Sequence, residues 1–322
     1  MVSVIIPVYQ VSDYIERCLR SVMAQTYTDI ECIIVDDATE DDSIVKCEHL
    51  IEEYKGPVRF KILHHSENRG LSAARNTGTD TASGEYVYYL DGDDEITPDC
   101  IEKLVSIAQE HPEAEMIQGN SVMIPDDRHF RVYVDRRMPN YLSSNREIVR
   151  YYHKHWIPTS AWNKLIKHSF LKDNELVFKE GLVYEDLHWM FFVMKHIENI
   201  RMCKDVTYHY YVRPDSIVKA TDKDTLGKSY SMIYGDILNE LTPGREREEL
   251  NCYVEGFCRC YLNYGKETPE FVNLYRQYQE LTKIYDCRVS RLKLSIVAML
   301  GKMPFGLTLL QWMKDIKTAL GS

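Results

Sequence analysis

Val2-Ser3-Val4-Ile5-Ile6-Pro7-Val8 opens the chain as a nearly uninterrupted apolar run that is rich in β-branched residues. A run of this kind, without polar alternation, is typical of a strand that is buried on both faces of a parallel sheet. Pro7 has no backbone N–H, so we expect the strand to stop there as a central strand. The segment predicts the first, interior strand of an α/β domain.

The hundred residues that begin with this strand alternate between two hydrophobic periods. We expect further strands over 30–35, 58–64 and 86–90, and helices over 14–22, 43–54, 71–82 and 100–110. Ser12 or Asp13 is expected to cap the first helix. Strand–helix alternation implies parallel pairing in a three-layer α/β/α sandwich. Ligands of such sheets bind beyond the carboxyl ends of the strands, so residues that follow strands are candidates for a site.

The composition excludes some classes of protein. The 322 residues are 44% hydrophobic and 27% charged, a balance typical of globular proteins, and the net charge of −10 argues against non-specific nucleic-acid binding. The cysteines number nine, an odd count, and are scattered, which suits a reducing compartment, and Cys252, Cys258 and Cys260 are interpreted as helix residues. The start resembles no signal peptide, and no apolar stretch approaches the ~20 residues that span a bilayer. We therefore expect a cytoplasmic protein.

Strand signals fade beyond about residue 220, and helical patterns then dominate. We predict an α/β domain over 1–220 and a mainly helical region over 221–322 that serves packing, dimerisation or membrane association. An apolar run that includes Leu294, Ile296 and Leu300 has basic neighbours, and 307–320 repeats the pattern. Two interpretations stay open for 289–322: an amphipathic segment on an anionic membrane, or helices that pack on the first domain or in a homodimer.

An acidic turn, Asp91-Gly92-Asp93-Asp94, follows the strand predicted over 86–90. Two unit charges about 4 Å apart repel by roughly 4 kcal/mol at an effective dielectric near 20, so such a cluster favours a counter-cation. Oxygen ligands suit Mg²⁺ or Mn²⁺, and Gly92 would let the backbone aim Asp91 and Asp93 at one point. The turn alone does not separate this hypothesis from a solvated acidic turn that caps the helix starting near Pro98.

Two other segments end strands at the same predicted edge. Tyr9 could present a ring to a nucleotide base or be a plain surface aromatic. Asp36-Asp37 could accept hydrogen bonds from a base or ribose, or could cap the helix that begins near Asp41.

A third segment joins a turn to a helix. Asn68-Arg69-Gly70 precedes the helix over 71–82, and Arg69 and Arg75 lie near its start. Helix N-termini attract anions, and arginine offers forked donors to phosphate oxygens. The small residues Ala73, Ala74 and Gly78 are equally compatible with close helix packing.

Four segments, in this order and at these separations, resemble the family 2 glycosyltransferases, which have the GT-A fold. They are Val2-Ser3-Val4-Ile5-Ile6-Pro7-Val8-Tyr9, Val35-Asp36-Asp37, Glu67-Asn68-Arg69-Gly70 with Ala74-Arg75-Asn76, and Leu90-Asp91-Gly92-Asp93-Asp94. The ordered set is highly specific, and a looser resemblance continues to about residue 217. It implies that 1–220 is a GT-A catalytic domain that binds a nucleotide sugar.

The resemblance also implies roles for single residues. Tyr9 would lie against the base and Asp37 would bond to its edge, within a nucleotide-binding set of Pro7, Tyr9, Asp37, Arg69, Arg75, Gly92 and Arg213. Asp91 and Asp93 would hold Mn²⁺ or Mg²⁺ against the donor diphosphate, with Asp94 as an additional ligand. Arg213 and Ser216 would close over the diphosphate.

A second set of residues resembles the acceptor side and the base of the family. The segment Trp162-Asn163-Lys164-Leu165 resembles one near the acceptor side of bacterial members of the family. The resemblance therefore implies acceptor-side positions for Trp162, Lys164 and Glu185. Glu185-Asp186 resembles the Glu-Asp pair whose aspartate is the catalytic base, although acidic residues in a first helical turn also favour the helix dipole. His209 is expected to be a packed strand residue rather than a ligand.

The expected function is metal-dependent, inverting sugar transfer from a nucleotide sugar, with UDP as the expected carrier, to a saccharide or lipid-linked acceptor in surface polysaccharide synthesis. A peripheral position on the inner face of the cell membrane would suit such an acceptor. Two alternatives remain. A sugar nucleotidyltransferase needs a glycine-rich loop where this chain has Pro7-Val8-Tyr9-Gln10-Val11-Ser12, and a non-catalytic nucleotide-sugar-binding subunit would not need Asp91, Asp93 and Asp186 intact.

Overall fold

The structure is a computed structural model that describes residues 1–124, 131–132, 138–213, 221–264 and 268–300. The chain divides into two compact units, Met1–Ser216 and Ile217–Ser322. This division falls near the domain boundary predicted after residue 220.

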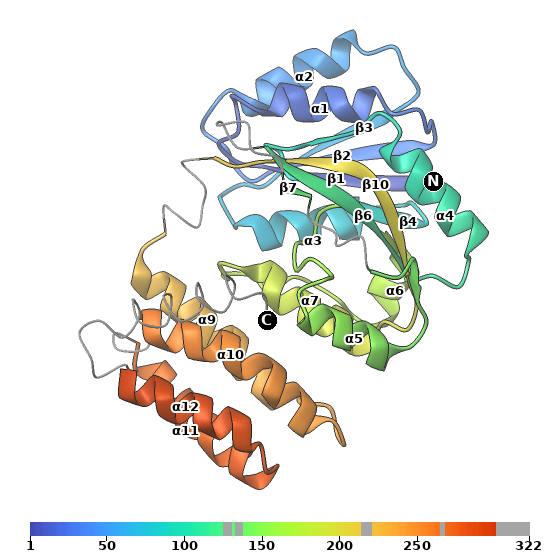
Figure 1. Ribbon diagram of the computed structural model, residues 1–322. Helices are drawn as coiled ribbons and strands as arrows, with labels where there is room; N and C mark the ends of the chain where they lie inside the picture. Colours follow the sequence, from blue (N-terminus) through green and yellow to red (C-terminus); the bar gives the residue numbers. More distant parts are fainter. Residues whose placement is uncertain (125–130, 133–137, 214–220, 265–267, 301–322) are drawn as a thin grey trace. The chain divides into compact units, whose positions relative to one another are not determined.

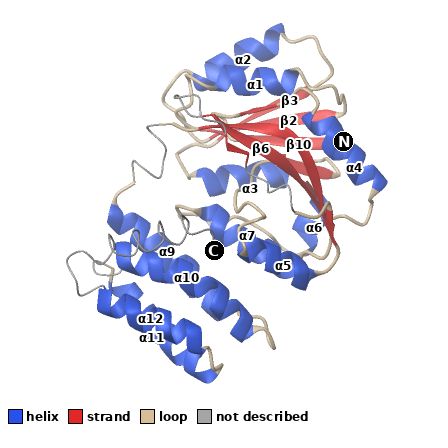
Figure 2. Ribbon diagram, viewed as in Figure 1, coloured by secondary structure: helices blue, strands red, loops and turns tan. Residues whose placement is uncertain are grey.

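The first unit is built on one mixed sheet, which in the described residues has ten strands (Figures 1 and 2). Its main path runs β3-β2-β1-β4-β9-β6-β10-β5, with β7 beside β6 and β8 beside β10. The strands are β1 Val2–Val8, β2 Ile30–Asp36, β3 Arg59–His64, β4 Tyr86–Tyr89, β5 Glu95–Ile96, β6 Met116–Ile124, β7 Arg131–Val132, β8 Tyr141–Leu142, β9 Lys164–Lys167 and β10 Ile200–Tyr211. Strands β1 to β4 pair in parallel as predicted, whereas β9 runs antiparallel between β4 and β6.

Helices cover both faces of this sheet, and each face has its own hydrophobic core. Val4 and Ile6 of β1 belong to the core that includes residues of α1, α2 and α4, whereas Ile5 belongs to the core on the other face with residues of α3, α5, α6 and α7. The helices are α1 Ile15–Met23, α2 Ser43–Glu53, α3 Leu71–Thr81, α4 Cys100–Glu110, α5 Asn145–His153, α6 His168–Asp173 and α7 Glu185–His196. The burial of β1 on both faces explains its uninterrupted apolar sequence.

Strand β1 spans Val2–Val8, the bounds of the predicted run, with Pro7 opposite Val35 on β2. Its pairing with β4 ends at Ile5, so the missing N–H of Pro7 falls beyond that ladder and β1 is no longer paired on both sides there. One local prediction was wrong: helix α1 has neither Ser12 nor Asp13 at its N-cap position, which Tyr14 occupies without a side-chain capping bond.

Helix α3 packs closely on β1 and β2 through small residues. Ala73, Ala74 and Gly78 are buried. A Cβ atom on Gly78 would collide with Ile5 Cγ2 at the centre of the sheet. The close approach fixes the position of α3, and therefore of the residues at its N-terminal end, relative to the ends of the strands.

The second unit is helical in its described part, as predicted. Its helices are α9 Lys223–Asn239, α10 Glu246–Tyr264, α11 Pro269–Ile284 and α12 Arg288–Leu300. Phe257 of α10 stacks on Tyr278 of α11 with ring centroids 4.2 Å apart, and both side chains are buried. Cys252, Cys258 and Cys260 lie on α10, as expected of helix residues. Among the described residues, none of the helices combines the length and apolar character that crossing a bilayer requires. The predicted pattern over 307–320 lies outside the described residues, as do Ser216 and most of the stretch 126–137.

Candidate active site

The acidic turn lies between β4 and β5, at the carboxyl end of the parallel strands. One carboxylate oxygen from each of Asp91, Asp93 and Asp94 lies within 4.8 Å of the other two, so the sequence-predicted cluster does form. A Cβ atom on Gly92 would lie 3.2 Å from the Pro7 carbonyl oxygen and 3.3 Å from Val11 Cγ2. Glycine is therefore favoured at position 92 because the turn packs against the end of β1.

The three aspartates have different partners. Asp94 is buried and accepts hydrogen bonds from the Tyr208 hydroxyl at 2.7 Å and from the Tyr211 N–H at 2.8 Å. Asp93 Oδ2 lies 2.7 Å from Arg213 Nε in an ion pair. Asp94 thus links the turn to β10, and Asp93 faces a cation that the sequence assigned to the diphosphate.

The cluster carries more negative charge than its burial favours. Burial and the charge of Asp91 together raise the pKa of Asp93 to about 6, although Arg213 opposes the rise. Burial and the charges of Asp93 and Asp91 hold the pKa of Asp94 well above its usual range. A divalent cation with a preference for oxygen ligands would offset this repulsion, so the residues present fit Mn²⁺ or Mg²⁺.

A single buried guanidinium connects the acidic turn to the predicted base. Arg75 on α3 donates from Nη2 to Asp91 Oδ1 at 2.9 Å. From Nη1 it donates to Glu185 Oε1 at 2.7 Å and to Asp186 Oδ1 at 2.8 Å. Only 1% of its side chain is exposed. The sequence placed Arg75 on the nucleotide side, but its position argues against that role because carboxylates occupy both terminal nitrogens.

Glu185 and Asp186 occupy the first turn of α7. Asp186 Oδ2 accepts a hydrogen bond from the Ala161 N–H at 3.1 Å, and 22% of the side chain stays exposed. Burial raises the pKa of Asp186, an effect that Arg75 opposes. Burial and the charge of Asp186 raise the pKa of Glu185 to about 7. The pair is thus oriented by Arg75 and by the backbone of Ala161, with part of Asp186 open to a ligand.

Asp37 anchors the loop that leads into α3. Its Oδ1 accepts from the Arg69 N–H at 2.9 Å and its Oδ2 from the Gly70 N–H at 2.7 Å, while His65 Nδ1 lies 2.7 Å from Oδ1. Gly70 has a φ of 87°, a conformation that favours glycine. The sequence did not indicate this anchoring role, and the contact of Asp37 with a base stays a prediction.

Two residues predicted on the nucleotide side are exposed. Tyr9, directly after β1, is 40% exposed, so one edge of its ring can meet a ligand. Arg69 forms an ion pair with Glu180 at 3.1 Å, and a little under half of each side chain is exposed. Their roles in nucleotide binding stay predictions.

Trp162 and Lys164, which the resemblance places on the acceptor side, are core residues in this structure. Trp162 is buried and stacks on Tyr208 with ring centroids 4.4 Å apart. Lys164 is fully buried, its Nζ donates to the Ser160 carbonyl oxygen, and burial lowers the pKa of Lys164 to about 7. Neither side chain has appreciable exposed surface with which to contact an acceptor. Trp162 instead supports Tyr208, the partner of Asp94 that sequence reasoning did not single out.

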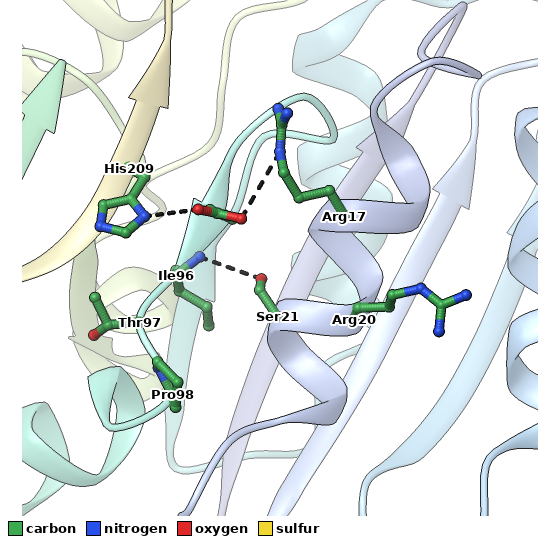
Figure 3. Close-up of a pocket in the computed structure, with 8 residues that line it drawn as sticks. Arg17, Arg20, Ser21, Ile96, Thr97, Pro98 and His209 are labelled. Carbon is green, nitrogen blue, oxygen red and sulfur yellow. Dashed lines mark hydrogen bonds and ion pairs between the residues drawn. The ribbon is translucent and has the colours of Figure 1, made fainter. Parts of the chain in front are cut away.

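A pocket of about 510 Å³ is lined by Glu95, directly after the acidic turn, and by none of the three aspartates. Figure 3 shows its lining side chains, which come from α1, from the segment after the turn and from β10. Glu95 in this pocket has its Oε1 2.7 Å from His209 Nδ1 and its Oε2 3.8 Å from Arg17 Nε. Arg17 Nη2 also donates to the Asp93 carbonyl oxygen at 2.7 Å. Nothing in the sequence pointed to Arg17, which supports the acidic turn from α1 through this bond. The lining residues are Arg17, Arg20, Ser21, Glu95, Ile96, Thr97, Pro98 and His209.

Solved structures show the class to which this fold belongs. Over 92% of this chain and 90% of the other, the structure is similar to S. aureus TarS 1–349 in complex with UDP-GlcNAc, with a TM-score of 0.71 and 20% identity. It is also similar to the mannosyltransferase PcManGT from Pyrobaculum calidifontis in complex with GDP-Man and Mn²⁺, with a TM-score of 0.57 and 15% identity over 94% of this chain and 88% of the other. The fold is that of the GT-A glycosyltransferases.

Sequence comparison gives the family. The family described as "Glycosyl transferase family 2" matches residues 3–174, and the chain belongs to this family. The glycosyltransferase EpsJ of Bacillus subtilis is 29% identical over 276 residues, which are 81% of this chain and 76% of the relative. The sequence prediction of a family 2 glycosyltransferase with a GT-A fold is confirmed.

Proposed function

We propose that this glycosyltransferase is metal-dependent and inverting, and that it moves a sugar from a UDP-sugar to a hydroxyl group of a saccharide or lipid-linked acceptor in surface polysaccharide synthesis. One observation supports this most directly. The acidic turn and Asp186 both bond to the Arg75 guanidinium, so carboxylates suited to a metal and a carboxylate suited to a base lie side by side. The UDP-GlcNAc bound to TarS supports the choice of carrier.

Asp186 is the proposed general base. Its carboxylate accepts the proton of the acceptor hydroxyl while that oxygen forms a bond to the anomeric carbon. The bond from the anomeric carbon to the diphosphate oxygen breaks in the same step, and the nucleoside diphosphate leaves. This direct displacement inverts the anomeric centre and needs no covalent intermediate. The partial exposure of Asp186 gives the hydroxyl access to it.

Asp91 and Asp93 would hold Mn²⁺ or Mg²⁺, with Asp94 as a further ligand. The bound metal would stabilise charge on the departing diphosphate. Arg213 forms an ion pair with Asp93, and Arg69 lies partly exposed in the loop before α3, so both are proposed to assist at the diphosphate. The Mn²⁺ bound to PcManGT supports the choice of metal.

Asp186→Asn tests the base. Because asparagine keeps the size of the side chain and cannot accept the proton, the variant should lose transfer by two to four orders of magnitude, on the order of the contribution typical of general bases. Its affinity for UDP with Mn²⁺, measured by calorimetry, should stay close to that of the wild type. Normal sugar transfer by the variant would contradict the assignment.

The same measurements address the non-catalytic alternative. Slow, metal-dependent release of UDP from a nucleotide sugar by the wild type would exclude a subunit that only binds the donor. Binding without any release, across a panel of UDP- and GDP-sugars, would favour that subunit instead.

The acceptor is proposed to lie at a membrane surface. Helix α12 carries three exposed apolar side chains, Val289, Leu292 and Ile296, at spacings that place them on one face. Exposed basic residues lie beside this face, including Arg288 and Lys293. An apolar face with cationic neighbours suits contact with an anionic membrane, where a lipid-linked acceptor would be found. Homodimerisation through the same face is the alternative.

A further inference from the structure

Arg75 is placed differently from an arginine that binds a substrate phosphate. Its three bonds run to carboxylates from two distant segments: Asp91 in the acidic turn, and Glu185 and Asp186 at the start of α7. All three distances lie between 2.7 and 2.9 Å, the range of strong charge-assisted hydrogen bonds.

The surroundings of Arg75 fix it in this position. Its guanidinium lies 5.2 Å from the centroid of the Phe178 ring, on which it can rest. The neighbouring Asn76 bonds twice to the backbone of Phe178: its Nδ2 donates to the carbonyl oxygen and its Oδ1 accepts from the N–H, each at 2.8 Å. Helix α3 and the segment before α7 are thereby joined next to the guanidinium.

We propose that Arg75 is a positioning residue of the transfer reaction. It holds the carboxylate of Asp186 at a fixed place relative to Asp91, so that the base and the metal-binding turn share one geometry. The inference rests on the proposed function, since it needs Asp186 as the base and Asp91 as a metal ligand.

The chemistry of the two carboxylates explains why positioning is needed. Asp186 must meet the acceptor oxygen, while Asp91 must place the donor through the metal, and the two residues belong to separate elements. Arg75 constrains one oxygen of Asp186, and the Ala161 N–H constrains the other. Small displacements of reacting groups cost large factors in rate, so losing the guanidinium should affect the chemical step rather than donor binding.

The test compares Arg75→Gln and Arg75→Lys with the wild type. The readouts are kcat and KM for UDP release from UDP-GlcNAc, UDP-glucose and UDP-galactose with water as acceptor, and calorimetry of UDP with Mn²⁺. We expect kcat to fall about a hundredfold or more in both variants, with KM and the UDP affinity within about threefold. Lysine should not rescue kcat, because a point charge cannot reproduce the fork that spans Asp91 and Asp186.

Three results would overturn the inference. A loss of UDP affinity that matches the loss of kcat would show a nucleotide ligand instead. Full rescue by lysine would show that charge alone matters, and an unchanged kcat would show no role in the reaction.

Folding is controlled separately, because glutamine at position 75 leaves three carboxylates facing one another. The double variant Arg75→Gln/Glu185→Gln removes one of these charges, and Glu185→Gln alone is its matched control. We expect the double variant to unfold near the temperature of the control and still to have the low kcat of Arg75→Gln. A double variant that regains the kcat of the control would contradict positioning by Arg75.

Failure of the proposed function can be distinguished from failure of the inference about Arg75. If the wild type releases no UDP from any of these donors or from a wider panel of nucleotide sugars, the proposed function fails, and the inference fails with it. If the wild type turns over and the Arg75 variants match it, only the inference fails.

Discussion

Asp37 receives three hydrogen-bonding groups in a nearly inaccessible position: the amides of Arg69 and Gly70, and the His65 ring. Buried donors that lose their acceptor keep the full cost of desolvation. The carboxylate therefore determines the shape of the loop before α3, whatever it does for a nucleotide base.

Replacing Asp37 should reduce stability measurably. Asp37→Ala removes the acceptor of two backbone amides, so we expect the free energy of unfolding to fall by about 2–4 kcal/mol, and by about 1–3 kcal/mol for Asp37→Asn. Urea unfolding of the whole chain measures this. Asp13→Asn, at an exposed position, is the control and should change stability by less than about 0.5 kcal/mol. A change at Asp37 as small as that of the control would contradict the anchoring role.

Single residues also show what sequence could and could not predict about the site. Asp91 and Asp93 could be placed because both directly follow a buried strand, and strand ends of a parallel sheet meet at one edge. The partners of Arg75 could not, because Glu185 and Asp186 lie more than a hundred residues away and no local pattern encodes that contact. The burial of Lys164 could not be predicted for a related reason. Whether a charged residue on a strand is buried depends on the neighbouring strands and helices, which a single sequence does not identify.

Helix α3 illustrates how the packing of an element can fix the place of a buried side chain. Gly78 brings the helix against Ile5 of β1, and Arg75 lies one turn earlier on the same helix. A shift of α3 away from the sheet would therefore also move Arg75 relative to the carboxylates that it bonds.

Gly78→Ala should push α3 away from the sheet. Ile5 is β-branched and fully buried, so it cannot move aside, and overpacking of this kind costs about 1–3 kcal/mol. We expect that loss in urea unfolding, together with a lower rate of UDP release. The matched control is Gly235→Ala in α9, where the nearest atom to a new Cβ is Leu274 Cδ1 at 3.8 Å. That change should be neutral or stabilise by up to about 1 kcal/mol. Equal losses in both variants would contradict the argument.

Elements with strong periodicity were predictable, and those without it were not. Strands β1 to β4 and helices α1 to α4 lie within one or two residues of their predicted bounds. The later strands could not be predicted, because they are too short to show a hydrophobic period: β5, β7 and β8 have two residues each, and β9 has four. Strand β9 also enters the sheet antiparallel between β4 and β6, and strand order is set by contacts that a single sequence does not display.

The proposed metal dependence predicts an effect of ligand on hydrogen exchange that can be measured along the whole chain. UDP with Mn²⁺ should slow hydrogen exchange chiefly in the segments after β1, β2 and β4, since bound ligand stabilises the regions that hold it. EDTA should abolish this protection, because it would remove the cation that Asp91 and Asp93 are proposed to hold. Asp93→Asn is the control and should behave like the wild type in EDTA. Protection that persists undiminished in EDTA would contradict the proposed metal site.

Membrane contact can be tested in the intact chain. The triple change Val289→Ser/Leu292→Ser/Ile296→Ser removes the exposed apolar face of α12 and should weaken flotation with liposomes that contain anionic lipid by about tenfold or more. The unchanged chain should float better on anionic than on neutral liposomes. Sedimentation analysis reports the alternative: a dimer that the triple change dissociates, with no flotation in either protein, would place a second copy on this face instead.

Arg75 bonds to two segments of the chain for which separate roles are proposed: the acidic turn on the donor side and the start of α7, which carries the base. The proposed donor-side residues up to Asp94 lie in the first hundred residues, whereas the proposed base arrives from α7, and one side chain makes the described bonds between them. With this arrangement, we expect that the donor-side segment and the segment carrying the base can be exchanged between relatives. A chimera with residues 1–110 of this chain and the remainder of a relative would keep the donor preference of the first parent and take the acceptor preference of the second, as long as the second supplies a Glu-Asp pair for the guanidinium to hold.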